Sequence, residues 1–223
     1  MQLRLATRDT SERYVSAKQW RHATLDHCPW HPGRGCGFAR HGTYPRVRPA
    51  GTLIARWYCP QMRRTVSALP DCLASHYSGT LEELEVIVRT VEEARSLASA
   101  SESLRTDIEL PGALRYLRRV VTAVHAALLT LRALAPDRFA QIPATVLAFS
   151  ARIPDGAVLM GLRHEMSVYL VQLPTPFGFN PSRANASAPS RGFQQRTGAD
   201  PPFRFVEACL EPVADRYQES QTP

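Results

Sequence analysis

The sequence predicts an α+β fold in which a small β-hairpin unit precedes a mainly α-helical body. From residue 27 to residue 70, short apolar runs alternate with Gly and Pro, which is typical of strands joined by tight turns. From residue 79, apolar residues recur every three or four positions, which is the period of an amphipathic helix. The expected segments are a flexible basic tail over 1–26, the hairpin unit over 27–78, a helical domain over 79–173 and a largely disordered tail over 174–223.

The charge of the chain is concentrated in its first third. Apolar residues make up 44% of the 223 residues, charged residues make up 21%, and the net charge is +7. This composition argues against a fully disordered chain. Residues 1–70 hold 12 Lys and Arg against three Asp and Glu, whereas residues 71–223 hold 15 against 17. A basic block beside a nearly neutral body indicates a polyanionic partner, usually nucleic acid.

The apolar segments are too short or too polar to cross a membrane. The longest, over 120–135, is interrupted by His125 and Arg132. Residues 1–20 lack the apolar core of a signal peptide. We therefore expect a cytoplasmic bacterial protein with no membrane partner, located in the nucleoid if it binds DNA.

Three cysteines and a histidine have the spacing of a metal site. Cys28 and His31 form a Cys-x2-His turn, Cys36 follows, and Cys59 returns after 22 residues, enough for a hairpin. Zinc prefers four thiolate or imidazole ligands delivered by tight turns. We predict a zinc site made by Cys28, His31, Cys36 and Cys59, with His41 as a substitute ligand. The hairpin unit would then be zinc-ribbon-like.

The alternative is a decayed knuckle that folds without metal, or a set of buried free cysteines. A complete ribbon has a second ligand just after Cys59, where this chain has Met62, Arg63 and Arg64. A disulfide scaffold is disfavoured, because five cysteines leave one unpaired and no secretion signal is evident. We expect Cys72 to be a buried apolar residue and Cys209 to be incidental.

The helices of the body have identifiable start signals. Thr80 and Glu83 form a capping-box pattern, Ser96 can cap a short helix, and Pro111 suits the first position of a long one. The expected helices cover residues 80–95, 97–104, 111–134, 143–151 and 155–172.

The first three of these helices match a helix-turn-helix, in which the third helix enters the major groove of DNA. Arg115, Arg118 and Arg119 lie in the first turns of that helix. Arginine binds guanine through two hydrogen bonds or neutralises a phosphate. The alternative is an ordinary helical bundle whose arginines form a solvated face.

The third helix also carries a heptad seam. Its members step by three and four residues, and they are Leu114, Leu117, Val121, Val124, Leu128 and Leu131. Such a seam packs into the core of its own chain or pairs two copies in a homodimer, and core packing is the more common outcome.

The hairpin unit interleaves arginines with aromatic residues. On a hairpin this pattern forms a positive face that follows a phosphate backbone, and the alternative is a small aromatic core solvated by arginines. The residues predicted to contact DNA here are Arg40, Arg46, Arg56, Arg63 and Arg64.

Catalysis is not expected. The acidic residues of the second half are not placed in a run of strands that would assemble a two-metal site. No nucleophile elbow and no phosphate-binding glycine loop occurs.

Short motifs over residues 27–134 resemble the zinc-ribbon and helix-turn-helix leader region of bacterial insertion-sequence transposases. The motifs are Cys28-Pro29-Trp30-His31, Arg40-His41-Gly42-Thr43-Tyr44-Pro45-Arg46, Arg56-Trp57-Tyr58-Cys59-Pro60-Gln61 and Thr65-Val66-Ser67-Ala68-Leu69-Pro70. The resemblance implies DNA binding, with zinc held by Cys28, Cys59 and either His31 or Cys36. The chain departs from the pattern because the second knuckle lacks its partner ligand and no catalytic domain follows.

We therefore expect a non-catalytic DNA-binding protein, a stand-alone or truncated relative of those leader regions. The alternatives are a helical protein-interaction module and a decayed mobile-element remnant without activity.

Overall fold

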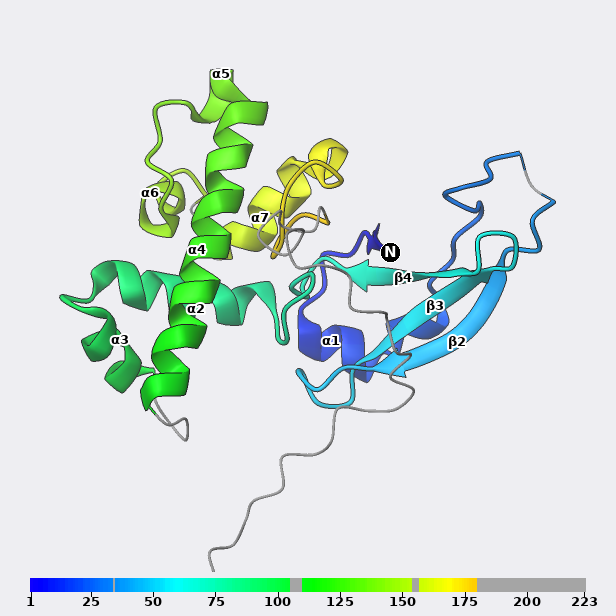
Figure 1. Cartoon of the computed structure of the whole chain (residues 1–223), viewed down its shortest axis with the longest axis horizontal. Coiled ribbons are helices and arrows are strands. Elements are labelled where there is room, and N and C mark those ends of the chain that lie inside the picture. Colours follow the sequence, from blue (N-terminus) through cyan, green and yellow to red (C-terminus); the bar gives the residue numbers. More distant parts are fainter. Residues whose placement is uncertain (34, 105–109, 154–156, 180–223) are drawn as a thin grey trace, which may run out of the picture. The chain divides into compact units, whose positions relative to one another are not determined.

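The computed structural model describes residues 1–33, 35–104, 110–153 and 157–179. Within these residues it contains a four-stranded sheet and a group of helices, which confirms the α+β class (Figure 1). The predicted tail covers 174–223, and its part from residue 180 onward lies outside the described residues. In the part of the chain that is described, none of the helices combines the length and apolar content needed to cross a bilayer.

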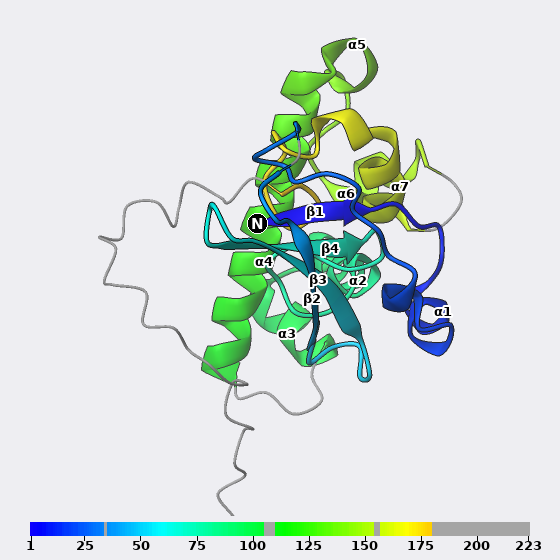
Figure 2. The same ribbon diagram turned by 90° about the vertical axis from the view of Figure 1, so that its right-hand side faces the viewer.

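The sheet contains more than the predicted hairpin. Strands β2 (Ala39–Pro45), β3 (Leu53–Cys59) and β4 (Arg64–Pro70) form an antiparallel meander, and β1 (Gln2–Leu5) pairs in parallel with β4. The strand order is therefore β1-β4-β3-β2, with β1 and β2 at the edges (Figure 2). A register shift in β2 lies between Arg40 and Thr43.

The prediction that residues 1–26 form a flexible tail is wrong. After β1 come helix α1 (Ser11–Ser16) and the single turn η1 (Gln19–Arg21). Tyr14 is completely buried, Trp20 is 7% exposed, and their rings lie 5.8 Å apart. The Tyr14 hydroxyl donates a hydrogen bond to the carbonyl of Leu53 at 3.0 Å. This segment therefore forms part of the core against the sheet.

Within the described residues, the helical body follows the expected order, with α4 at its predicted length, four shorter helices and one additional short helix, α5, that the sequence did not predict. The capping box of Thr80 and Glu83 is present at the start of α2. The helix predicted over 155–172 ends early, because α7 stops before Met166 and a short turn, η2, replaces its second half. The helices are α2 (Leu81–Glu93), α3 (Leu97–Ser103), α4 (Leu110–Leu134), α5 (Pro136–Phe139), α6 (Val146–Ser150), α7 (Val158–Glu165) and η2 (Ser167–Tyr169).

The heptad seam of α4 packs inside its own chain. Val124, Leu128 and Leu131 have no exposed surface and belong to one apolar cluster with residues of α2, α6 and α7. Leu117 is 4% exposed, and Leu114 and Val121 are half-buried. The seam residues thus follow the core-packing alternative, and the three fully buried ones are not available to pair with a second copy.

Residues 174–179, assigned to the tail in the sequence prediction, are part of the core. Phe177 is completely buried, and Thr175 is 5% exposed. The amide of Ser75 donates to the carbonyl of Pro176 at 2.7 Å, so this segment is bonded to the residues that follow β4. The sequence prediction is wrong here because Pro and Gly, which usually interrupt helices and strands, shape a buried turn in this segment.

A buried arginine joins the sheet to α7. Arg163 lies on α7 with no exposed surface, and its guanidinium donates to backbone carbonyls on two segments. Its Nε atom donates to Phe177 at 2.7 Å, Nη2 donates to Pro176 at 2.8 Å, and Nη1 donates to Asp71 at 3.0 Å and to Leu73. Burial lowers the pKa of Arg163, and the charge of Asp71 opposes that shift. Four carbonyls thus stand in for water around one buried cation.

We expect Arg163→Met to destabilise the protein by about 3–5 kcal/mol, because the carbonyls of Asp71, Leu73 and Phe177 lose their donor at once, whereas that of Pro176 keeps Ser75. Urea unfolding followed by circular dichroism measures this free energy. The matched control is Arg152→Met, at an exposed arginine, which should change stability by less than about 0.5 kcal/mol. A loss below about 1 kcal/mol for Arg163→Met would show that water replaces the guanidinium without strain.

Candidate metal centre and its basic surroundings

Four side chains converge beside the end of β3. Cys28 and His31 face each other across a tight turn, in which the His31 amide donates to the Cys28 carbonyl at 3.2 Å. Cys36 follows in the next loop, and Cys59 is the last residue of β3. The ligand atoms of these four residues all lie within 4.8 Å of one another, which is close enough to hold one metal ion.

The distances within this Cys-His tetrad fit a tetrahedral ion. His31 Nδ1 lies 3.4 Å from the Sγ atoms of both Cys28 and Cys59. Metal bonds of about 2.3 Å to sulfur and about 2.0 Å to nitrogen, at tetrahedral angles, separate neighbouring ligand atoms by roughly 3.5 Å. All three cysteines are buried and unpaired, and Trp30 and Phe38 pack against them.

The thiols of the tetrad differ in their acidity. Burial raises the pKa of Cys28, but hydrogen bonds from the Trp30 backbone and the His31 ring outweigh it and lower that pKa to about 7. Burial raises the pKa of Cys36, with a smaller opposing effect from the Phe38 backbone. A thiolate is the form that binds metal, so the lowered pKa of Cys28 favours its role as a ligand.

A glycine lets the loop close around the tetrad. Gly37, directly after Cys36, has a φ of +69°, in the left-handed region that other residues rarely adopt. A Cβ atom there would lie 3.4 Å from the Pro60 side chain, which follows Cys59. The close approach of these two segments brings Cys36 to Cys59.

Two other sequence candidates lie outside the tetrad. His41, considered as a substitute ligand, instead lies against Tyr58, with ring centroids 5.5 Å apart. Cys72 is buried, as expected for an apolar residue, and burial raises its pKa to about 11. Cys209 lies outside the described residues.

Arg40, which the sequence assigned to DNA, is engaged by the fold. Its guanidinium donates to the carbonyls of Arg21 at 3.0 Å, Ala23 at 3.3 Å and Trp20. It also lies over the Trp57 ring, 5.7 Å from the centroid. Arg40 therefore attaches the N-terminal segment to the sheet.

Arg46 is engaged in the same way. It donates to the carbonyl of Ala74 at 3.1 Å and to the carbonyl of Tyr77. Burial lowers the pKa of Arg46. The sequence predictions for Arg40 and Arg46 missed these roles because their backbone acceptors lie far along the chain.

The other three arginines of the sheet that were predicted to contact DNA, Arg56, Arg63 and Arg64, lie in a part of the sequence without carboxylates. Residues 27–70 contain seven arginines and no Asp or Glu. Arg63 is exposed in the turn between β3 and β4, Arg64 is exposed as the first residue of β4, and Arg56 is half-buried on β3. The pKa of the Met1 amino group is lowered by burial and then by the positive charges of Arg64 and Arg56, so both guanidinium groups lie near this group.

A second positive surface lies on α4. Arg115, Arg118 and Arg119 are exposed, and residues 110–134 contain no Asp or Glu. The Arg119 guanidinium lies 5.6 Å from the ring centroids of both Tyr77 and Tyr116. Helices α2, α3 and α4 pack against one another as a three-helix group, and the link over 105–109 lies outside the described residues.

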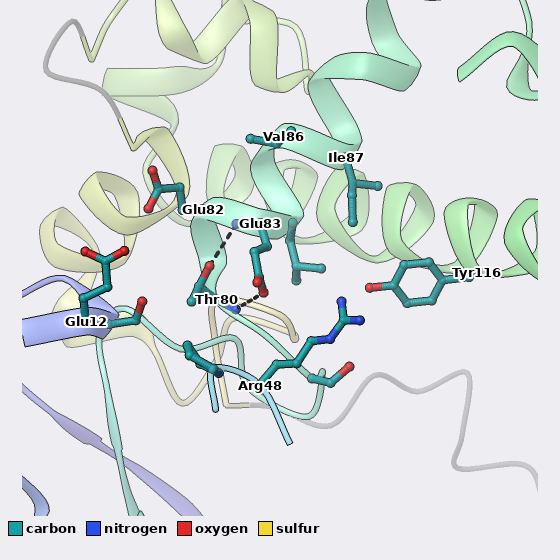
Figure 3. A pocket seen from close by; sticks show the side chains of 12 residues that line it. Glu12, Arg48, Thr80, Glu82, Glu83, Val86, Ile87 and Tyr116 are labelled. Carbon is teal, nitrogen blue, oxygen red and sulfur yellow. Dashed lines mark hydrogen bonds between the residues drawn. The ribbon is translucent and has the colours of Figure 1, made fainter. Parts of the chain in front are cut away.

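A pocket of about 570 Å³ lies between the residues that precede α2, the β2–β3 loop and Tyr116 (Figure 3). Its lining mixes Glu12, Glu82 and Arg48 with apolar side chains. The Glu83 carboxylate is used by the capping box, where it accepts from the Thr80 amide at 2.8 Å. We assign no ligand to this pocket.

Comparison with protein-family models, with curated proteins and with solved structures finds no match. The resemblance to transposase leader regions therefore depends on the short motifs of the sequence alone.

The tetrad predicts about one divalent metal ion per chain in protein purified without chelator. We expect Cys36→Ser and Cys59→Ser to lose the ion, because each removes a ligand, and Cys72→Ser to retain it, because this buried cysteine lies outside the tetrad. Elemental mass spectrometry of the purified variants measures the ratio. Folded wild-type protein without metal, or metal retained by both ligand variants, would contradict the assignment.

Proposed function

We propose that the protein is a non-catalytic DNA-binding protein in which a structural zinc ion stabilises the sheet and α4 contacts the major groove. The observation that carries the proposal is the exposed face of α4, where three arginines lie on a helix without a single acidic residue. The stand-alone relation to transposase leader regions is part of the proposal and depends on the sequence motifs.

The spacing of the arginines suits a groove-binding helix. Arg115, Arg118 and Arg119 are three and four residues apart, so they lie on one side of α4. The same side continues with two small exposed residues, Thr122 and Ala126. Small side chains after a cluster of arginines allow the helix to approach the base edges while the guanidinium groups reach guanine or phosphate.

Zinc is the ion that the ligand set favours. Three thiolates and one imidazole form a closed tetrahedral set, which is typical of structural zinc sites. A closed set leaves no position for a substrate or an activated water. The proposal therefore gives the metal a folding role and assigns the protein no reaction.

The zinc ion and the positive surfaces are coupled through the fold. Cys59 ends β3, Arg63 follows in the turn, and Arg64 begins β4. Binding of zinc by Cys59 would fix the start of that turn and hence the position of the two exposed arginines. These arginines supply additional phosphate contacts beside those of α4.

The test is the salt dependence of binding to duplex DNA, measured by fluorescence anisotropy. We expect Arg118→Ala to weaken binding and to reduce the slope of log K against log salt by about 1, because one phosphate contact is lost. The control is Arg152→Ala, which removes one exposed arginine far along the sequence from both surfaces and should leave the slope unchanged.

The two variants carry the same net charge, so a general electrostatic attraction would weaken both equally. Equal loss in Arg118→Ala and Arg152→Ala would overturn the assignment to α4. Binding that does not change between low and high salt would overturn DNA binding itself and favour an apolar protein-interaction module.

A further inference from the structure

One end of the sheet presents aromatic and cationic side chains on a single face. In the antiparallel register, Arg56 lies opposite Ser67 and Tyr58 lies opposite Thr65. Directly opposed residues point to the same side of a sheet, and residues two apart share a face. Arg56, Tyr58, Ser67 and Thr65 therefore lie on the same face.

Two further aromatic residues of β2 extend this face. Tyr44 lies opposite Ile54, two residues before Arg56, and its ring lies 5.4 Å from the Arg56 guanidinium. His41 is exposed and lies against Tyr58. We call these five residues, His41, Tyr44, Arg56, Tyr58 and Thr65, the open sheet face.

The other side of the sheet is already covered. Trp57 and Cys59 alternate with Arg56 and Tyr58, so they point the opposite way, and both are buried. Trp57 packs with Trp20 and Ala23 of the N-terminal segment. On the open side, Ile54 and Leu69 at the far end of the strands are also buried. Only the end that carries the open sheet face remains accessible.

Arg56 is held in position with donors to spare. One face of its guanidinium lies on the Tyr44 ring, and Nη2 donates to Thr65 Oγ1 at 3.2 Å. An arginine has five N–H donors, and within the described residues this is the one hydrogen bond that Arg56 makes through its side chain. The remaining donors are available to an anion, and no carboxylate occurs in residues 27–70 to compete.

We propose that the open sheet face binds single-stranded DNA, with bases stacked on the Tyr58–His41 pair and a phosphate held by Arg56. Bases in a duplex are stacked on each other and hide their faces, whereas unpaired bases stack on exposed aromatic rings. The positive charge of Arg63 in the adjoining turn complements the backbone of such a strand. The inference rests on the proposed DNA-binding function and adds a second surface to α4.

The test compares binding of three fluorescent probes to the full-length, metal-loaded chain. The probes are a single-stranded DNA of about 16 nucleotides, the duplex of the same sequence, and single-stranded RNA of that sequence. The variant is His41→Ala with Tyr58→Leu, which removes both rings while leucine keeps the apolar bulk at position 58. We expect its affinity for single-stranded DNA to fall by about tenfold or more, with duplex affinity unchanged.

Two controls separate stacking from hydrogen bonding by the Tyr58 hydroxyl and from a loss of folding. Tyr58→Phe keeps the ring and should bind single-stranded DNA like the wild type. Metal content and the thermal unfolding midpoint of the double variant should match those of the wild type, because His41 and Tyr58 lie outside the tetrad and are not fully buried.

The possible outcomes distinguish this surface from α4. Loss of single-strand binding in the double variant and loss of duplex binding in Arg118→Ala would support two separate surfaces. Unchanged single-strand affinity in the double variant would overturn the inference and leave the proposed function intact. Equal loss on duplex and single strand would also overturn it, and clearly tighter binding of RNA would overturn the choice of DNA.

Discussion

The buried guanidinium of Arg163 is the contact on which the connection between sheet and helices depends. One cation on α7 donates to carbonyls at the end of β4 and in the turn over 176–177. Removing a charge from water costs several kcal/mol, and only a complete set of acceptors offsets that cost. The backbone of both segments must therefore keep its position. Because β4 pairs with β1 and β3, the same constraint extends across the sheet.

The Cys-His tetrad complements this constraint at the other end of β3. The apolar cluster around its three cysteines is small, with Trp30 and Phe38 packed against it. So small an apolar cluster contributes little stability by itself, and in our proposal a bound metal ion supplies the rest. The sheet is thus fixed by a buried cation at one end and, in our proposal, by a zinc ion at the other. Among the arginines of the sheet between these two ends, Arg40 and Arg46 hold backbone segments together, whereas Arg63 and Arg64 are exposed.

Local signals in the sequence were sufficient for the tetrad and for the starts of the helices. The spacing of Cys28, His31, Cys36 and Cys59 predicted the cluster that the structure contains, and Thr80 with Glu83 predicted the capping box. These signals act within a turn or a hairpin, so the interacting residues lie close together in the sequence. The metal itself and its identity stay predictions.

Long-range contacts were not predictable in the same way. Strand β1 has four residues and pairs with β4 more than sixty positions away, as in the pairing of Gln2 with Ser67. Arg163 resembles any polar residue of a helix until its acceptors are brought to it by the fold. The open sheet face required the register of β3 and β4, because the two strands alone do not show which of their residues share a side.

The position of Arg163 has a consequence for synthesis of the chain. Arg163 follows Asp71 by 92 residues, and at about 5–20 residues per second the strands leave the ribosome roughly 5–20 seconds before it does. During that interval the carbonyls of Asp71 and Leu73 lack the guanidinium, and the side of the sheet's apolar cluster that Met160 and Phe179 contact is still uncovered. A nascent chain arrested within α2–α6 would present this surface to chaperones and proteases. The contact between sheet and helices can therefore close only after α7 has been synthesised.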